Sequence, residues 1–150
     1  GDLKYGRTVH SLVKVLALFQ DITIYGYSLP GFALPESYIQ FLQERNVRYI
    51  PCSHDKELPR NLDVIYQTRT QRERFPEGQQ EVHEIVIDRA FMNHFSPDTL
   101  LLHPLPRNRE IAFEVDQDPR ALYFEQARNG MYVRMALLYK LLAHSGLRKV

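Results

Sequence analysis

The segment Ile22-Thr23-Ile24-Tyr25-Gly26-Tyr27 decides the fold, because its β-branched and aromatic residues favour a strand. Apolar residues recur at helical spacing just before it, which predicts a helix that begins near Thr8. A turn with proline and glycine follows over 28–31, and a second helix opens at Pro35. A short strand over 47–50 completes this first helix–strand–helix–strand unit.

The rest of the chain continues the alternation. Strands are predicted over 62–66 and 99–102, with a short helix over 88–95 between them. The region 119–144 is predicted to be mostly helical, with a break at Gly130. Six apolar residues of this region lie close to one face of the predicted helix: Phe124, Ala127, Met131, Met135, Leu138 and Leu142.

This alternation predicts parallel strands joined by right-handed crossovers, and so a three-layer α/β/α domain with a mostly parallel sheet. The 150 residues are 44% hydrophobic and 25% charged, as is usual for one globular domain with its own core. We therefore expect residues 1–150 to form a single domain. Parallel sheets of this kind bind ligands at the carboxyl ends of their strands.

Composition excludes several classes of function. Lys and Arg number 19 against 18 Asp and Glu, so the net charge of +1 gives no overall attraction to nucleic acid or to acidic membranes. A single cysteine, Cys52, cannot form an internal disulfide framework and favours a reducing compartment. Without a membrane-length apolar run or a signal-peptide pattern, the chain is predicted to be cytoplasmic.

The first segment of interest, Gly1-Asp2-Leu3-Lys4-Tyr5-Gly6-Arg7-Thr8, has the spacing of a phosphate-binding loop. Arg7 stands where such a loop has lysine, and a guanidinium suits two-point contact with a carboxylate or a phosphate. The alternative is a helix-entry turn with a solvated arginine. A nucleotide-binding protein is disfavoured by the replaced lysine.

The second segment, Thr68-Arg69-Thr70-Gln71-Arg72-Glu73-Arg74-Phe75, directly follows a predicted strand. Arg69 and Gln71 are two residues apart, so in an extended stretch they project to one side and offer a guanidinium and an amide to a carboxylate. Arg72 and Arg74 are interpreted as part of a solvated, Glu73-paired run. The alternative for Arg69 and Gln71 is the same solvated role.

The third segment, His103-Pro104-Leu105-Pro106-Arg107, follows another predicted strand. Its two prolines restrict the backbone, and such a rigid turn can aim carbonyl groups at a ligand with N–H donors. The alternative is a structural strand-exit turn. The six histidines show no metal-binding spacing, and no nucleophile elbow or dinucleotide fingerprint is present, so neither a metal nor a cofactor is expected.

Four motifs together resemble one family: GDLKYGRTVHSL at 1–12, TRTQRERF at 68–75, HPLPR with the following EI and EVD at 103–116, and YFEQARNGMYVRMALL at 123–138. Their order and spacing are similar to the carboxyl-terminal, aspartate-binding half of the aspartate carbamoyltransferases, a Rossmann-like domain, over essentially the whole chain. Ornithine-using relatives typically have HCLP where this chain has HPLP.

The resemblance implies transfer of the carbamoyl group from carbamoyl phosphate to L-aspartate, giving N-carbamoyl-L-aspartate and phosphate in pyrimidine biosynthesis. It assigns residues to three roles. The aspartate carboxylates would be held by Arg7, Arg69 and Gln71, with a contribution from Lys4. Carbamoyl phosphate would contact Pro104, Leu105 and Pro106, and Arg134 would support the site from the last helix.

The resemblance also implies partners. In the family, the amino-terminal carbamoyl-phosphate-binding domain and neighbouring subunits of a homotrimer complete the site, and this chain contains no such amino-terminal domain. We therefore expect the isolated chain to turn over carbamoyl phosphate negligibly. The competing hypothesis is a non-catalytic domain that binds a dicarboxylate or assembles with partners.

Overall fold

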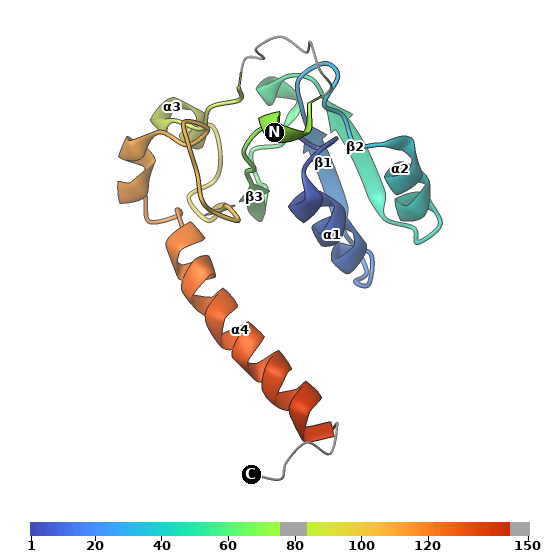
Figure 1. The fold of residues 1–150 in the computed structure, drawn as a ribbon. Coiled ribbons are helices and arrows are strands. Elements are labelled where there is room, and N and C mark those ends of the chain that lie inside the picture. Colours follow the sequence, from blue (N-terminus) through green and yellow to red (C-terminus); the bar gives the residue numbers. More distant parts are fainter. Residues whose placement is uncertain (76–83, 145–150) are drawn as a thin grey trace.

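The computed structural model describes residues 1–75 and 84–144, and its first half is a helix–strand–helix–strand unit. The elements are α1 (Arg7–Leu16), β1 (Thr23–Tyr27), α2 (Glu36–Gln43) and β2 (Arg48–Cys52). Strands β1 and β2 pair in parallel, with Thr23 opposite Arg48 and Tyr27 opposite Cys52. Figure 1 shows α1 and α2 beside this strand pair. All four elements lie where the sequence predicts them.

The second half is built around another parallel pair, β3 (Val64–Tyr66) and β4 (Leu100–Leu102). Helix α3 (Arg89–Met92) lies between them in sequence, and short 3₁₀ turns occupy Asp55–Glu57, Arg72–Arg74 and Phe113–Gln117. The Asp88 carboxylate accepts a hydrogen bond from the Phe91 N–H and so caps α3. The α/β class and the parallel pairing are confirmed. In the described residues the strands form two separate pairs, where we expected one mostly parallel sheet.

Each half has its own hydrophobic core. Val13 and Leu42 centre the first, where α1 and α2 pack with β1 and β2. The second core is built around Met92, Leu101 and Tyr123, each of which is fully buried. A smaller cluster around Cys52, Leu58 and Phe95 contains residues of both halves. The two strand pairs are thus held in one body by apolar packing.

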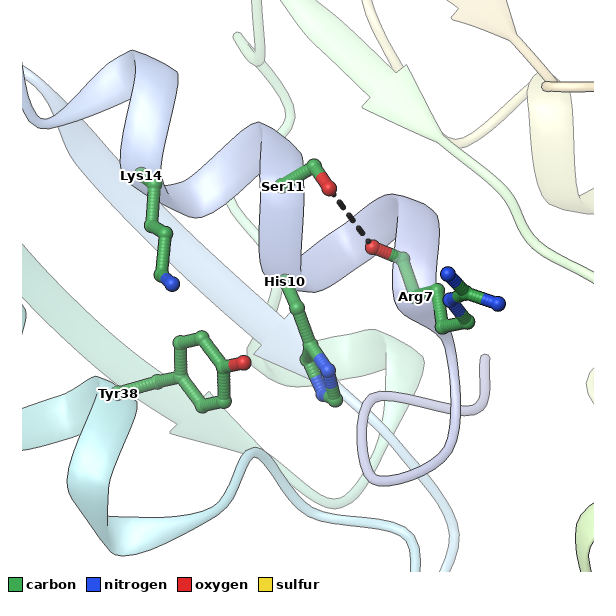
Figure 2. Close-up of a pocket in the computed structure, with 5 residues that line it drawn as sticks. All are labelled: Arg7, His10, Ser11, Lys14 and Tyr38. Atoms are coloured by element: carbon green, nitrogen blue, oxygen red, sulfur yellow. Dashed lines mark hydrogen bonds between the residues drawn. The ribbon is translucent and has the colours of Figure 1, made fainter.

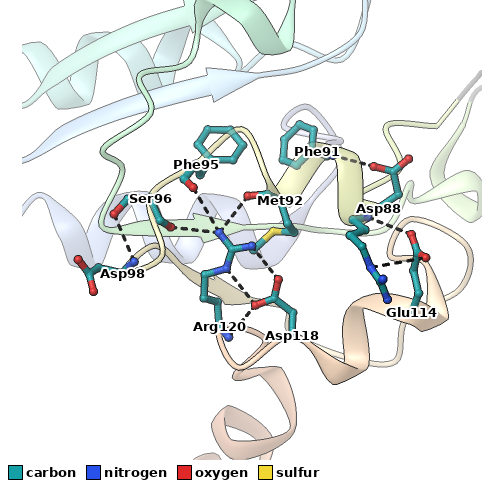
Figure 3. A network of polar contacts seen from close by, with 10 residues as sticks. Asp88, Phe91, Met92, Phe95, Ser96, Asp98, Glu114, Asp118 and Arg120 are labelled. Carbon is teal, nitrogen blue, oxygen red and sulfur yellow. Dashed lines mark hydrogen bonds and ion pairs between the residues drawn. The ribbon is translucent and has the colours of Figure 1, made fainter.

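Arg120 adds polar contacts within the second half (Figure 3). Its guanidinium donates to the carbonyls of Met92, Phe95 and Ser96 and forms an ion pair with Asp118 at 2.7 Å. Met92 is the last residue of α3, and Phe95 and Ser96 belong to the segment that follows the helix. Arg120 thereby holds the segment that follows β4 against α3.

Helix α4 (Tyr123–His144) extends away from the rest of the molecule (Figure 1). The predicted break at Gly130 is wrong, since the helix runs through it; strong helix formers around Gly130 offset the roughly 1 kcal/mol cost of one glycine. Most of helix α4 is exposed. Only its first residue, Tyr123, is buried, while side chains such as Met135 and Leu138 are about 60% exposed because α4 leaves the body after one turn. In the described part of the chain, no helix is long and apolar enough to span a membrane.

Candidate functional site

The Asp2 side chain joins the first and second segments. It is almost fully buried, and its carboxylate accepts hydrogen bonds from the N–H groups of Lys4 at 3.1 Å and Tyr5 at 2.8 Å. Its other oxygen accepts the Gln71 N–H at 3.0 Å. One carboxylate thus shapes the loop before α1 and fixes it against the loop after β3.

Further contacts hold these two loops together. Arg74 donates to the Tyr5 carbonyl at 2.7 Å, and the Phe75 ring packs 5.6 Å from the Tyr5 ring. The fit around Gly1 is close, since a β-carbon there would lie 2.9 Å from the Thr68 hydroxyl oxygen. That hydroxyl is the one buried side-chain polar atom without a hydrogen-bond partner among residues 1–75 and 84–144. The loops are therefore a packed unit at the end of β3, with an unused polar group inside it.

Arg69 is engaged by a neighbour. Its guanidinium makes two hydrogen bonds to Glu73, at 2.5 and 3.3 Å, across one turn of chain. Hydrogen bonds from the Glu73 backbone N–H and from Arg69 hold the pKa of Glu73 below its usual value. Arg72 instead pairs with Glu84 at 3.2 Å, so the prediction that Glu73 pairs within the Arg72–Arg74 run is wrong. Glu73 occupies the two-point geometry that Arg69 was expected to offer to a ligand carboxylate.

Arg7 is exposed and lines a pocket of about 200 Å³ between α1 and α2. Figure 2 shows this pocket with His10, Ser11 and Lys14 from the same helix and Tyr38 from α2. Arg69 does not line it. The expectation that Arg7 and Arg69 meet on one small molecule therefore stays a prediction.

The third segment is fixed by a buried network around His103. The His103 Nδ1 accepts the Leu105 N–H at 2.9 Å, so the proton of a neutral ring lies on Nε2 and is donated to Glu110 at 3.0 Å. The Asn108 N–H donates to both oxygens of Glu110. Burial opposes ionisation of Glu110, but the hydrogen bonds from His103 and the backbone outweigh it and hold the pKa below its usual value.

This network shapes the turn that the sequence predicted to be rigid. Leu105 has a φ of 45°, a conformation that is costly for a leucine, and its N–H is held by His103. Pro104 and Leu105 are half-buried, while Pro106 is exposed. The rigidity of the turn thus comes from a buried histidine and glutamate as well as from the prolines.

Tyr66, the last residue of β3, connects the first and third segments. Its hydroxyl interacts with the side chains of Thr8 and Gln126; burial raises the pKa of Tyr66, and these two contacts oppose the rise. The Gln126 carbonyl oxygen also accepts the His103 N–H at 3.0 Å. Residues from α1, β3, α4 and the strand-exit turn therefore meet at the carboxyl end of β3, as expected for a parallel α/β protein.

Two of the predicted site residues, Lys4 and Arg134, lie at the edge of this arrangement of segments. Lys4 is exposed, with its ammonium group 5.1 Å from the centre of the Tyr5 ring. Arg134 is exposed on α4, three turns beyond the buried Tyr123. In the described part of the chain, neither side chain forms an ion pair with the second or third segment, and their roles stay predictions.

Sequence reasoning missed the residues that organise the site: Asp2, Tyr66, His103 as a partner of Glu110, and Gln126. A signal existed for Asp2, which is the one acidic residue of the motif at 1–12. No pattern indicates the long-range partner of Tyr66 or Gln126. Among the described residues, no group of three or more His, Cys, Asp or Glu side chains is arranged to hold a metal ion.

A parallel α/β body that gathers anion-suited loops at one strand end defines a small-molecule-binding domain of the α/β class. The family model for the aspartate/ornithine carbamoyltransferase Asp/Orn binding domain matches residues 1–141. The chain therefore belongs to the carbamoyltransferase family, and it corresponds to the Asp/Orn binding domain.

Individual relatives point to the aspartate branch of the family. The chain is 45% identical to an aspartate carbamoyltransferase catalytic subunit from Clostridium botulinum over 95% of its own length and 48% of that protein. It is 41% identical to one from Clostridium kluyveri over 95% of the chain and 47% of the relative. It thus spans about half the length of these curated relatives.

Solved structures agree. The catalytic subunit of M. jannaschii aspartate transcarbamoylase superimposes with a TM-score of 0.85 at 38% identity, covering 99% of this chain and 49% of that one. The Trypanosoma cruzi aspartate transcarbamoylase in complex with carbamoyl aspartate and phosphate superimposes with a TM-score of 0.79 at 37% identity. The match covers 93% of this chain and 44% of that one. The fold of the chain is therefore that of the corresponding part of these enzymes.

Proposed function

We propose that this chain is the aspartate-binding half of an aspartate carbamoyltransferase. The observation that carries the proposal is the hydrogen bond from the Gln71 N–H to Asp2, which fixes the loop that bears Arg69 and Gln71 against the loop that leads to Arg7. The similarity to aspartate carbamoyltransferase catalytic subunits, rather than to ornithine enzymes, supports aspartate as the amine substrate.

In this proposal Arg7, Arg69 and Gln71 bind the carboxylates of L-aspartate, and Lys4 adds positive charge near them. Because Glu73 already pairs with Arg69, the guanidinium is held in a fixed position before substrate arrives. A guanidinium that is already held in position loses less conformational freedom on binding than a mobile one. The carboxylate of the substrate would then share the Arg69 guanidinium with Glu73 or take the place of Glu73 there.

The turn at Pro104, Leu105 and Pro106 would place backbone carbonyls at the amide nitrogen of carbamoyl phosphate. The His103–Glu110 pair supports this role, because it fixes the Leu105 N–H and with it the direction of the neighbouring carbonyls. The neutral amine of aspartate would then attack the carbamoyl carbon, with phosphate as the leaving group. Arg134 would support the site from α4.

The chain spans about half of its curated relatives, so an amino-terminal domain and neighbouring subunits would complete the site. The assembled enzyme is proposed to be a cytoplasmic trimer that supplies carbamoyl aspartate to pyrimidine synthesis. The isolated chain is expected to bind aspartate weakly and to form negligible carbamoyl aspartate.

The test compares two variants in an enzyme completed with the amino-terminal half. Arg69→Ala should raise the aspartate concentration needed for half-maximal rate and lower turnover much more than Arg72→Ala, the matched control, whose arginine pairs with Glu84. Equal effects of the two substitutions would remove the case for a specific aspartate contact. If the completed protein binds a dicarboxylate but shows no transfer, the chain is a binding or assembly domain instead.

A further inference from the structure

Strand β1 pairs with β2 along one edge only. The N–H of Arg48, in β2, donates to the Ile22 carbonyl, and backbone groups alternate in direction from there, so the even-numbered residues of β1 turn theirs toward β2. The odd-numbered residues turn their backbone groups to the opposite edge: Thr23, Tyr25 and Tyr27. Among residues 1–75 and 84–144, no strand pairs with that edge.

Strand β3 has an unpaired edge of the same kind. The Leu100 N–H, in β4, donates to the Asp63 carbonyl at 2.9 Å, so the odd-numbered residues of this stretch face β4. The backbone groups of the even-numbered residues face away from β4: Val64, Tyr66 and Thr68. In the part of the chain that the structure describes, this edge has no partner strand either.

Gly1 lies between the two edges. Its amino group donates to the Tyr27 carbonyl at 2.7 Å, as the last residue of a parallel strand beside β1 would. A β-carbon at Gly1 would lie 3.0 Å from the Thr68 carbonyl oxygen, so the other edge is equally close. Because Tyr27 ends β1 and Thr68 follows β3, the carboxyl ends of both strands meet at Gly1. A strand that arrives at Gly1 would therefore run parallel to both.

The surroundings of the Gly1 nitrogen suit a peptide bond better than a charged amino group. Burial lowers the pKa of this amino group to about 5, and the nearby Asp2 carboxylate offsets only part of that effect. A peptide N–H could donate to the Tyr27 carbonyl in the same way without the cost of burying a charge. A segment that ends in a strand at Gly1 would also continue through α1 into β1, which is the usual strand–helix–strand unit of a parallel sheet.

We propose that the two edges bind one further β-strand, about five residues long, which the chain immediately ahead of Gly1 supplies in a longer protein. It would join β1 and β3, and so make the two strand pairs one parallel sheet. The length follows from β1, which has five residues and ends beside Gly1. The curated relatives are long enough to hold such a segment, since this chain spans 48% of the Clostridium botulinum protein.

The composition of the added strand follows from what covers the sheet. Ile24 packs in the first core, whereas Tyr25 packs in the cluster around Cys52, so both faces of β1 are covered. Strands covered on both faces are near-continuous apolar runs rich in Val and Ile. We therefore expect a β-branched apolar segment. This inference does not rest on the proposed function, because no aspartate contact enters it.

The test extends the 150-residue chain ahead of Gly1 by Val-Ile-Val-Ile-Val, with Gly-Ser-Gly-Ser-Gly as the matched control. Hydrogen exchange of the Tyr25 and Tyr66 amides, measured by NMR, should be slower by about tenfold or more with the apolar extension. The amides of Gly26 and Ile65, which face β2 and β4, should change less. Val-Ile-Pro-Ile-Val should lose most of the slowing, because proline removes a backbone donor from the middle of the strand.

Three results would overturn the proposed strand. The first is equal exchange at Tyr25 and Tyr66 with the apolar and the Gly-Ser extensions. The second is exchange at these amides as slow as at Gly26 in the unextended chain, since another part of the chain would then already pair with the edges. The third is slowing that grows with protein concentration, because the extended chains would then associate with one another. Circular dichroism of the extended chains establishes that they are folded.

This test and the test of the proposed function fail separately. Equal effects of Arg69→Ala and Arg72→Ala on transfer would leave the strand site standing. Unchanged amide exchange at Tyr25 and Tyr66 would equally leave the aspartate contacts standing.

Discussion

The backbone N–H of Gln71 donates a hydrogen bond of 3.0 Å to the buried carboxylate of Asp2, 69 residues earlier in the chain. The same carboxylate accepts two further N–H groups within its own loop. A buried anion with three donors is stable, because the donors take the place of the water molecules that hydrate the carboxylate in the unfolded chain. This single side chain therefore sets the relative position of the two loops proposed to bind aspartate.

Replacing Asp2 with alanine should lower the free energy of unfolding by about 2–3 kcal/mol, because three N–H groups lose their acceptor in a buried place. Asp2→Asn keeps one acceptor oxygen and should lose less. Urea unfolding measures both, with Asp63→Ala, at an exposed carboxylate, as the control. A loss in Asp2→Ala no larger than in the control would show that the loops are held mainly by their aromatic packing.

Replacing Arg120 with alanine should cost about 3 kcal/mol or more of unfolding free energy. Its side chain is only 11% exposed, and its removal takes away the hydrogen bonds to the Met92 and Ser96 carbonyls and the ion pair with Asp118. Arg120→Lys keeps a positive charge but lacks the planar guanidinium, so it should lose less unfolding free energy than Arg120→Ala. Arg89→Ala is the matched control, since that side chain is 66% exposed and lies 3.9 Å from Glu114; it should change stability by less than about 0.5 kcal/mol. Similar losses in both alanine variants would contradict this account.

The stability of the domain should fall in acid partly through Glu110. Its pKa in the folded chain is held below the ordinary value of 4.5, so ionised Glu110 stabilises the fold fully above that pH and this contribution is lost as the pH falls through the folded-state value. Urea midpoints measured between about pH 6 and about pH 3 should therefore drop less steeply in Glu110→Gln than in the unaltered chain. Glu44→Gln, on an exposed carboxylate, should keep the original slope. If the urea midpoint of Glu110→Gln depends on pH as steeply as that of the unaltered chain, groups other than Glu110 cause the loss of stability in acid.

Apolar residues along α4 should contribute little to the stability of this chain. Met135→Gln and Leu138→Gln replace side chains that are about 60% exposed, so each should change the unfolding free energy by less than about 0.5 kcal/mol. Leu101→Ala, in the second core, should cost about 2–5 kcal/mol by the same measurement. A large loss in either α4 variant would mean that the helix packs against the body in solution.

The order of helices and strands could be predicted from sequence, because it depends on local periodicity. The strand Thr23–Tyr27, the helix Glu36–Gln43 and the strand Leu100–Leu102 all lie within the predicted segments. The four motifs were likewise enough to indicate the family, which the match over residues 1–141 confirms. Helix α4 was predicted as a helix for the same reason, but its apolar pattern could not show whether a partner covers it.

The sequence by itself determined which residues form elements, that the strands run parallel, and which three segments bear the anion-suited side chains. Only the tertiary structure decided that Asp2 binds the Gln71 backbone, that Glu73 pairs with Arg69, and that His103 and Glu110 hold the turn at Leu105. The physical reason is the range of the interactions. Periodicity and propensity act over a few neighbouring residues, whereas a buried carboxylate takes its donors from whichever part of the chain the fold brings to it.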